Sequence, residues 1–479
     1  MGNEWPVTCL NRHISIKHGF AFKGEYFKDS PTSNCLLTPG NFAIGGGFKG
    51  DKYKYYDGPV PSDYVLKSGN LVVTMTDLSK QADTLGYSAL IPEQSVKRFL
   101  HNQRTGLVQF KDDALDKTFL YFLLRSKEYR HHVVSGATGT TVKHTSPTKI
   151  LSYEFRIPPK DLQISIGNYL LSIEKKISLN LQINQTLEQM AQTLFKSWFV
   201  DFDPVVDNAL DTGFFEQDLA FSEELLHRVE MRKIARESGN FKSLPEDIRK
   251  LFPSSFEKCE ELSLGLGGWV PKGWEVSTVG DELTVKGGST PSTANPEFWV
   301  GGNIHWTSPK DLSGSKEKIM LDTERKITDV GLNKITSGLL PVETVLMSSR
   351  APIGYLALTK IPVAVNQGYI AIPTTKRLSP EYVLYWLNSS MDEIKGIAGG
   401  TTFAEISKKT FKSISMVIPN TKVIGIYTVT TKSYLNKMTL NATERSALEK
   451  LRDALLPKLI SGELSLSDVK TSIAEDASI

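Results

Sequence analysis

The clearest pattern of hydrophobic and polar positions runs through two long stretches, residues 161–199 and 422–460. In the first stretch, one stripe of residues recurs every seven positions, and a second stripe alternates with it at spacings of three and four. The first stripe is Ile166, Ile173, Asn180, Leu187 and Leu194, and the second is Leu170, Ile177, Asn184, Ala191 and Trp198. In the other stretch, the first stripe becomes Tyr427, Tyr434, Asn441, Leu448 and Leu455. This spacing predicts two long coiled-coil helices, and the alternative is an amphipathic helix packed on its own domain.

The region before each long helix has a different pattern. Short apolar runs rich in β-branched residues, such as residues 71–75 and 344–347, alternate with Gly, Pro and Thr, which is typical of strands between long loops. One short helix is predicted within each region, over residues 117–129 and 380–394. A strand that ends in proline, at Pro158 or at Pro419, then leads into the long helix.

This order of elements occurs twice because the sequence itself is duplicated. Residues 139–141 (Gly-Thr-Thr) recur as residues 400–402, a shift of 261 (400 − 139). Toward the N-terminus the shift drifts to 269 (274 − 5), where Trp5 matches Trp274. A slowly drifting shift indicates one duplicated module with small loop insertions. The period is too long for a solenoid, whose repeats span about 20–50 residues.

We therefore predict an α+β fold with two duplicated mixed α/β modules. Two long antiparallel coiled-coil helices would separate the modules, with a pseudo-two-fold axis between them. Asn180 and Asn441 both lie near mid-helix, and a buried Asn fixes the register of such a pair, so both are expected close to the axis. The predicted segments are module one (1–159), the first helix (160–202), a connector (203–268) with a charged helical stretch at 223–237, module two (269–419), the second helix (420–463) and a polar tail (464–479).

Composition limits the class of protein. The net charge of +3 comes from 56 basic and 53 acidic residues, so a DNA-binding surface would have to arise from local clustering. The three cysteines, Cys9, Cys35 and Cys259, form no CxxC motif and favour a reducing cytoplasm. The N-terminal residues lack the apolar core of a signal peptide, and no stretch approaches the ~20 apolar residues that span a membrane.

Motifs of catalysis are missing from the sequence. There is no Gly-Lys dipeptide for a nucleotide-binding P-loop, no H-E-x-x-H and no zinc-ligand spacing. Residues 393–395 have the E-x-K spacing of some nucleases, but the other copy reads Glu-Tyr-Arg at 128–130. Residues 295–298 (Asn-Pro-Glu-Phe) resemble a methyltransferase motif only superficially. We therefore predict a chain without catalytic or metal-binding residues.

The polar loops of both modules suit DNA instead. Lysines interleave with tyrosines over residues 48–56, and lysine binds phosphate, whereas arginine, asparagine and glutamine can pair with base edges. An ordinary hydrated loop is the alternative for each residue taken singly. The candidates in module one are Lys49, Lys52, Tyr53, Lys54, Thr76, Gln103, Arg104, Thr140, Thr141 and Lys143. Those in module two are Ser289, Thr290, Thr307, Lys310, Ser349, Arg350, Gln367, Thr401 and Thr402.

The two helical stretches carry a family resemblance. Residues 184–204 (NQTLEQMAQTLFKSWFVDFDP) closely resemble the central conserved region of the DNA-specificity (S) subunits of type I restriction–modification enzymes. Residues 451–464 resemble the distal conserved region of that family. Residues 288–299, 306–312 and 349–354 resemble parts of its target-recognition domains, whereas module one departs from the loop patterns at residues 19–22 and 75–78.

The resemblance implies a non-catalytic reader of DNA sequence in a bacterial or archaeal restriction system, which defends the cell against viruses. Each module would read one half of a split site in double-stranded DNA. The helices would set the spacing and dock two methylation subunits, which carry S-adenosylmethionine. Motor–nuclease subunits that use ATP and Mg would join them, and this chain would hold no cofactor itself. A stand-alone two-headed DNA-binding or regulatory protein, or a protein scaffold, is the alternative.

The helix ends are predicted to take part in docking. Apolar residues lie at matching places near the ends of both helices, and we expect them to offer exposed surface to two equivalent partners. The alternative is that they only close the helix pair. The residues assigned to the helix pair and to docking are Asn180, Leu187, Leu194, Phe195, Trp198, Phe199, Asn441, Leu448, Leu455, Leu456 and Leu459.

Overall fold

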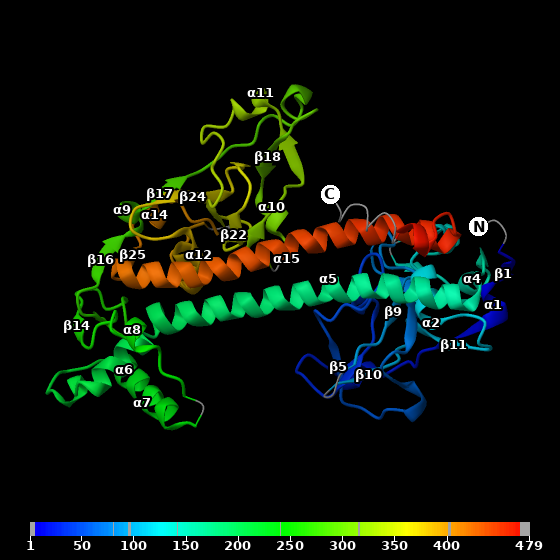
Figure 1. The fold of residues 1–479 in the computed structure, drawn as a ribbon, viewed down its shortest axis with the longest axis horizontal. Helices are drawn as coiled ribbons and strands as arrows, with labels where there is room; N and C mark the ends of the chain where they lie inside the picture. The colour runs from blue at the N-terminus through cyan, green and yellow to red at the C-terminus, as the bar shows by residue number, and fades with distance from the viewer. Residues whose placement is uncertain are drawn as a thin grey trace. The chain divides into compact units, whose positions relative to one another are not determined.

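The two long helices form where the heptad pattern places them. In the computed structural model, α5 (Lys160–Phe195) continues into a π-helical turn (Lys196–Val200), and α15 (Thr421–Ser461) follows the second module (Figure 1). The structure describes residues 5–79, 81–93, 97–140, 142–239, 241–314, 317–400 and 404–469. The chain forms two compact units, residues 1–178 with 445–479 (unit 1) and residues 179–444 (unit 2), so each long helix contributes to both units.

Unit 1 contains module one. Its central sheet has four antiparallel strands in the order β2 (Ile14–His18), β11 (Thr105–Phe110), β7 (Leu71–Thr74) and β9 (Ser88–Leu90). A second sheet has the order β3 (Phe27–Lys28), β5 (Lys54–Tyr56), β4 (Asn34–Leu36), β10 (Arg98–Leu100) and β6 (Val65–Leu66). Two further pairs join β1 (Val7–Cys9) to β13 (Glu154–Arg156) and β8 (Thr76–Asp77) to β12 (Lys143–His144). The helices of the module are α1 (Leu10–His13), α2 (Lys117–Leu123), α3 (Lys127–Ser135) and α4 (Pro147–Leu151).

Unit 2 contains module two and repeats the plan. Its main sheet has the order β17 (Leu283–Lys286), β24 (Tyr369–Thr375), β21 (Val345–Ser348), β22 (Leu356–Thr359) and β19 (Ile319–Met320). A three-stranded sheet has the order β20 (Arg325–Ile327), β18 (Ile304–Thr307) and β23 (Ala364–Val365), and β16 (Glu275–Thr278) pairs with β25 (Ser415–Ile418). Its helices are α9 (Val279–Glu282), α10 (Pro309–Leu312), α11 (Asp329–Leu332), α12 (Pro380–Ser389), α13 (Met391–Gly396) and α14 (Lys408–Lys412).

The strand order confirms the duplication. The antiparallel run β2-β11-β7-β9 of unit 1 corresponds to β17-β24-β21-β22 of unit 2, and the pair β1·β13 corresponds to β16·β25. The fold is therefore the α+β arrangement of two like modules and two long helices that the sequence predicts.

The prediction of a single short helix is wrong in both modules, because each module has two short helices in its place. In unit 1, Asp116 caps α2 by accepting hydrogen bonds from the backbone of Thr118 and Phe119, and Ser126 caps α3 by accepting one from Tyr129. A side chain that satisfies the free N–H groups of a new first turn starts a second helix there. In unit 2, α12 and α13 meet at Ser390, which makes no side-chain capping hydrogen bond; its backbone N–H donates to the Trp386 carbonyl.

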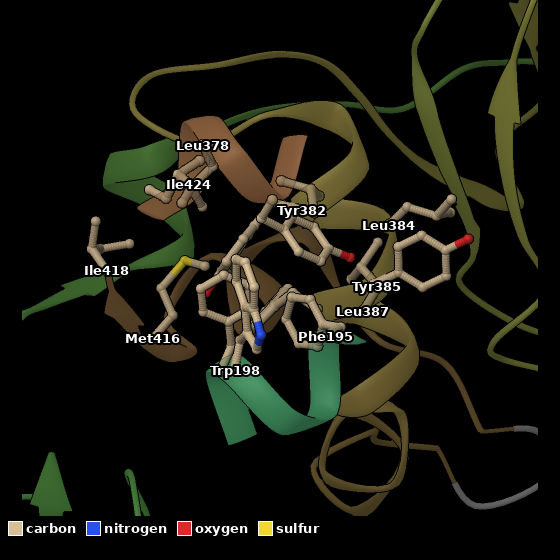
Figure 2. Packing of buried hydrophobic residues seen from close by; sticks show 14 of the residues in the cluster. Phe195, Trp198, Leu378, Tyr382, Leu384, Tyr385, Leu387, Met416, Ile418 and Ile424 are labelled. Atoms are coloured by element: carbon tan, nitrogen blue, oxygen red, sulfur yellow. The ribbon is translucent and has the colours of Figure 1, made fainter. Parts of the chain in front are cut away.

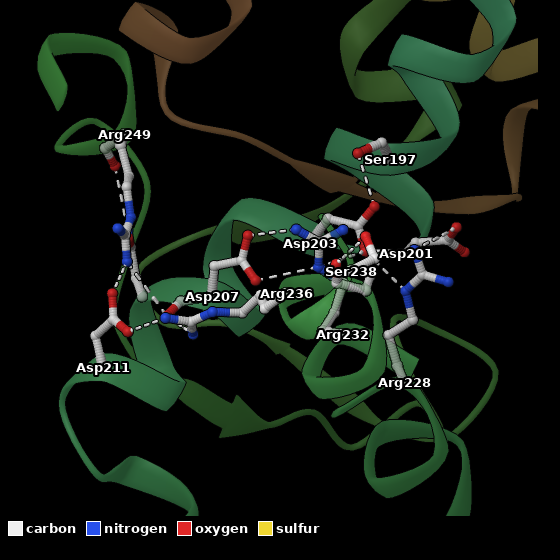
Figure 3. A network of polar contacts seen from close by, with 12 residues as sticks. Ser197, Asp201, Asp203, Asp207, Asp211, Arg228, Arg232, Arg236, Ser238 and Arg249 are labelled. Carbon is white, nitrogen blue, oxygen red and sulfur yellow. Dashed lines mark hydrogen bonds and ion pairs between the residues drawn. The ribbon is translucent and has the colours of Figure 1, made fainter. Parts of the chain in front are cut away.

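The described part of the connector forms helices and strands and belongs to unit 2. It holds α6 (Asp203–Asp211), α7 (Glu223–Glu237) and α8 (Glu246–Arg249), followed by the strand pair of β14 (Phe256–Lys258) and β15 (Trp269–Pro271). A ladder of ion pairs joins α6 to α7 at three successive turns, through Asp203–Arg228, Asp207–Arg232 and Asp211–Arg236 (Figure 3). Each pair is separated by 25 residues. The constant separation means that α6 and α7 run side by side in the same direction.

The segment expected to be a polar tail is partly a core element. Leu464 and Leu466 pack against the hydrophobic core of unit 1, and Val469 is buried there. The polar composition of the segment as a whole conceals these three apolar positions. Residues 470–479 lie outside the described part of the chain.

Candidate nucleic-acid interface

The basic and amide residues predicted in module one gather around one hollow in unit 1. Six candidates line it, together with Asn102, and its volume is about 740 Å³. These candidates come from β5 and the loop before it, and from the turn between β10 and β11: Lys49, Lys52, Tyr53, Lys54, Gln103 and Arg104. Four of them are cations, and the only carboxylates of the described lining are Asp29 and Asp51. The hollow thus combines positive charge with aromatic and amide groups, which is the chemistry that binds DNA backbone and bases.

The turn that carries Gln103 and Arg104 is held by backbone contacts. The Gln103 N–H donates to the Phe20 carbonyl at 3.0 Å, and the Thr105 N–H donates to the Asn102 carbonyl at 3.0 Å. The chain passes so close to Gly19 that a Cβ there would lie 2.0 Å from the Asn102 carbonyl oxygen. Only glycine permits this approach, so Gly19 is required for the position of the turn.

The same close approach recurs in unit 2. A Cβ on Gly288 would lie 1.6 Å from the Val365 carbonyl oxygen, next to the turn that carries Gln367. Gly19 and Gly288 are matched by the duplication at a shift of 269 (288 − 19). Each module therefore presents an exposed glutamine, Gln103 or Gln367, on a turn placed by an equivalent glycine.

In unit 2 the exposed candidates have polar neighbours that orient them. The Thr290 hydroxyl donates to Gln367 Oε1 at 2.8 Å, so these two candidates meet. Arg350 forms an ion pair of 3.8 Å with Glu405, and Lys310 donates to Glu324 at 2.9 Å. These surface pairs add little stability, and they leave both cations partly exposed.

Three predicted DNA-binding residues are buried, and for them an exposed role is wrong. Thr76 lies 3.1 Å from His144 Nδ1, and Thr307 lies 3.3 Å from the Tyr369 hydroxyl. Ser349 is held by its backbone, which donates to Gly368 and accepts from Ile406. All three lie at or next to strand ends, where polar side chains satisfy internal groups. Thr140 is exposed and Lys143 is half-buried in β12, whereas Thr141, Thr401 and Thr402 lie outside the described residues.

The two long helices run antiparallel inside unit 2, and their asparagines join them. Asn180 donates to Glu444 at 2.8 Å, and Asn441 donates to Asn184 at 2.9 Å. From Asn180 to Asn184 along α5, the contacted residue of α15 changes from Glu444 back to Asn441, so the two helices are antiparallel. Asn184 also donates to the Met438 carbonyl at 3.0 Å. Asn180 and Asn441 are both 2% exposed, as the heptad pattern predicts.

The apolar helix ends are not exposed, which corrects the expected docking surface. Phe195, Trp198 and Phe199 are buried in unit 2, where Phe195 and Phe199 pack edge-on against Tyr382 (Figure 2). Leu455, Leu456 and Leu459 are buried in the core of unit 1. These residues close the cores of their units, and Leu187, Leu194 and Leu448 pack against the same cores. From the sequence, these apolar residues could form an exposed docking surface or pack inside the chain. Their burial excludes the exposed docking surface.

Two glutamates on α5 were missed by sequence reasoning. Glu174 and Glu188 are each largely buried, and each accepts a hydrogen bond from a tyrosine of its module. Nothing in the heptad pattern distinguishes them from solvated charges. Among the described residues, no cluster of His, Cys, Asp or Glu could hold a metal ion, and no helix combines the length and apolarity needed to cross a membrane.

Comparison with known proteins decides the family. The model of the type I restriction modification DNA specificity domain matches residues 44–189 and 271–450, one stretch in each half of the duplicated sequence. The chain belongs to this family. Its relatives are named as specificity subunits, so the chain is a non-catalytic specificity component of a restriction–modification system.

Three relatives illustrate the similarity. The HindI specificity subunit of Haemophilus influenzae is 31% identical over 72% of this chain and 77% of its own length. The MjaIX specificity subunit of Methanocaldococcus jannaschii is 39% identical over 32% of this chain and 36% of its own. A crystal structure of the S subunit from M. genitalium covers 95% of this chain and 96% of its own with a TM-score of 0.53 at 15% identity, which shows a shared fold.

Proposed function

We propose that this specificity subunit reads a split site in double-stranded DNA, with one half of the site recognised by each module. The observation that carries the proposal is the duplicated placement of Gln103 and Gln367, each on an exposed turn set by an equivalent glycine. Glutamine can form two hydrogen bonds with an adenine edge in the major groove. Two like reading surfaces on one chain suit a site in two parts.

The residues around these turns divide into two kinds. Lys49, Lys52 and Lys54 line the hollow of unit 1 and are exposed, so they suit phosphate contacts that do not depend on sequence. Arg104 and Arg350 carry the planar guanidinium that pairs with guanine. Phosphate contacts would position the duplex, and the arginine and glutamine side chains would specify the bases.

The proposed partners are two methylation subunits, which hold S-adenosylmethionine and transfer its methyl group to adenine. Motor–nuclease subunits that use ATP and Mg would complete the restriction complex in the cytoplasm. The duplication supports two equivalent partners. Since the apolar helix ends are buried, the partners would have to contact other surfaces of the helices or of the connector.

The experiment combines the purified chain with its methylation subunit and S-adenosylmethionine on a library of random DNA. Sequencing of methylated adenines should yield a motif of two short halves around an unspecified spacer. The chain alone should neither methylate nor cut DNA. A contiguous motif would contradict the split-site proposal, and methylation by the isolated chain, free of contaminants, would contradict its place in the complex.

A further inference from the structure

In unit 2, one carboxylate of α5 receives contacts from two separate parts of module two. Glu188 accepts a hydrogen bond from the Tyr385 hydroxyl of α12 at 2.8 Å. It also forms an ion pair with Lys318, which directly precedes β19. The side chains of Glu188 and Lys318 are only 12% and 15% exposed. Burial and the adjacent carboxylate raise the pKa of Tyr385, so its hydroxyl remains a donor.

Unit 1 contains an equivalent arrangement on the same helix. Glu174 of α5 accepts a hydrogen bond from the Tyr121 hydroxyl of α2 at 2.9 Å and lies 2.6 Å from Arg125. Arg125 in turn donates to the Gly45 carbonyl at 2.8 Å, and Arg452 of α15 lies 3.5 Å from Glu174. A tyrosine of the first short helix and a largely buried cation therefore meet a glutamate of α5 in both units.

The two anchors depart from the internal symmetry of the chain. At the shift of 261, the positions on α15 that match Glu174 and Glu188 are Leu435 and Glu449. Leu435 is buried, and Glu449 pairs with Arg445 of its own helix at 3.7 Å. The internal symmetry of the chain therefore does not relate the two anchors to each other.

A buried ion pair is a poor source of stability, because desolvation offsets much of the attraction. Such a pair can instead restrict the chain to one packing arrangement, since every alternative leaves a buried charge without its partner. A carboxylate that accepts contacts from two different elements adds a directional constraint to the apolar packing of α2 and α12.

We propose that Glu174 and Glu188 are positioning residues that fix the orientation of each module on the long helices and thereby set the spacer length accepted between the two DNA half-sites. This inference rests on the proposed split-site function. It assigns spacer discrimination to two largely buried side chains and not to the exposed DNA-binding candidates.

The test measures spacer preference and half-site preference separately, with the chain in its complex with the methylation subunit. The Glu188→Gln variant keeps the size of the side chain and removes the charge that Lys318 needs. We expect its preference for the native spacer over one a base pair longer to fall by roughly ten-fold, which corresponds to about 1.4 kcal/mol. The base preferences within each half-site should stay as in the wild type.

The chain supplies a matched control in Glu449→Gln, which changes the same residue type at the symmetry-related position. This variant should keep the wild-type spacer preference, because Glu449 is partly exposed and contacts its own helix. Lys318→Met is the second variant, chosen in case Glu188→Gln folds poorly. It should relax the spacer preference equally, and the double variant should be no worse than either single variant.

The outcomes separate the two proposals. A wild-type complex without any split motif would contradict the proposed function itself. A wild-type complex that reads a split site, with folded Glu188→Gln and Lys318→Met variants that keep its spacer preference, would overturn the positioning role alone. Altered base preferences within a half-site would also overturn it.

Discussion

The side-chain amide of Asn441 donates to Asn184 Oδ1 at 2.9 Å and joins α15 to α5 inside unit 2. Both side chains are 2% exposed. A buried asparagine in a helix pair costs stability relative to leucine, but it favours the one register in which its partner is also polar. The hydrogen bonds from Asn184 to Met438 and from Asn180 to Glu444 extend this polar contact along the same stretch.

Asn441→Ala is expected to destabilise unit 2. The substitution leaves Asn184 Oδ1 buried without this donor, which costs about 1–3 kcal/mol in the free energy of unfolding. Urea denaturation followed by circular dichroism measures the change. Thr443→Ala is the control, because Thr443 is exposed and its hydroxyl bonds only within its own helix. Equal stability of the wild type and Asn441→Ala would contradict a structural role for this contact.

Because His101 is buried, we predict that the protein loses stability in acid. The pKa of His101 is lowered from 6.5 to about 4, mainly by burial. The nearby Lys17 and His18 also lower this pKa, whereas a hydrogen bond with the Thr105 carbonyl opposes the shift. The unfolded chain therefore binds this proton more readily than the folded chain does. The free energy of unfolding should decrease as pH falls from about 6.5 toward 4, by up to about 3 kcal/mol.

The measurement is thermal or urea unfolding of the wild type and of His101→Gln between pH 7 and pH 4. The variant should lose the part of the pH dependence that His101 contributes, so the stability difference between the two proteins should shrink or reverse in acid. His131→Gln, which changes an exposed histidine of α3, should follow the wild type. Parallel pH profiles for the wild type and His101→Gln would contradict the assignment.

The long helices are predicted to act as a ruler for the split site. One heptad added to both α5 and α15 lengthens each by about 10 Å at 1.5 Å per residue, which is close to three base pairs of DNA. We expect the preferred spacer to lengthen while both half-site sequences stay unchanged, as read from methylated adenines in a random library. A change in the half-sites themselves would show that the helices do more than set distance.

The sequence predicted the long helices closely because their pattern repeats over many turns. It predicted the duplication because matches such as Gly19 with Gly288 reflect a backbone approach that only glycine allows. It missed the start of a second helix at Lys127, because that start depends on the single capping residue Ser126. It also took Phe195 and Leu455 for exposed surface, because an apolar residue does not show which other segment covers it.

The candidate site was predicted less completely for the same reason. Gln103 lies far from Lys49 and Lys52 in the sequence, yet all three residues line one hollow. Thr76 and Thr307 look like loop residues but are buried at strand ends. Glu174 and Glu188 were missed because their tyrosine and cation partners come from distant segments.

The central claim is that each module reads one half of the DNA site. Its most direct measurement compares the methylated-adenine motif of the wild-type complex with those of complexes carrying Arg350→Ala or Gln367→Ala, with Lys52→Ala as the control. A lost base contact should cost about 1–3 kcal/mol and relax positions in one half-site only. Lys52→Ala should weaken binding to all sequences and flatten its dependence on salt. Equal relaxation of both half-sites by Arg350→Ala and Gln367→Ala would contradict the account.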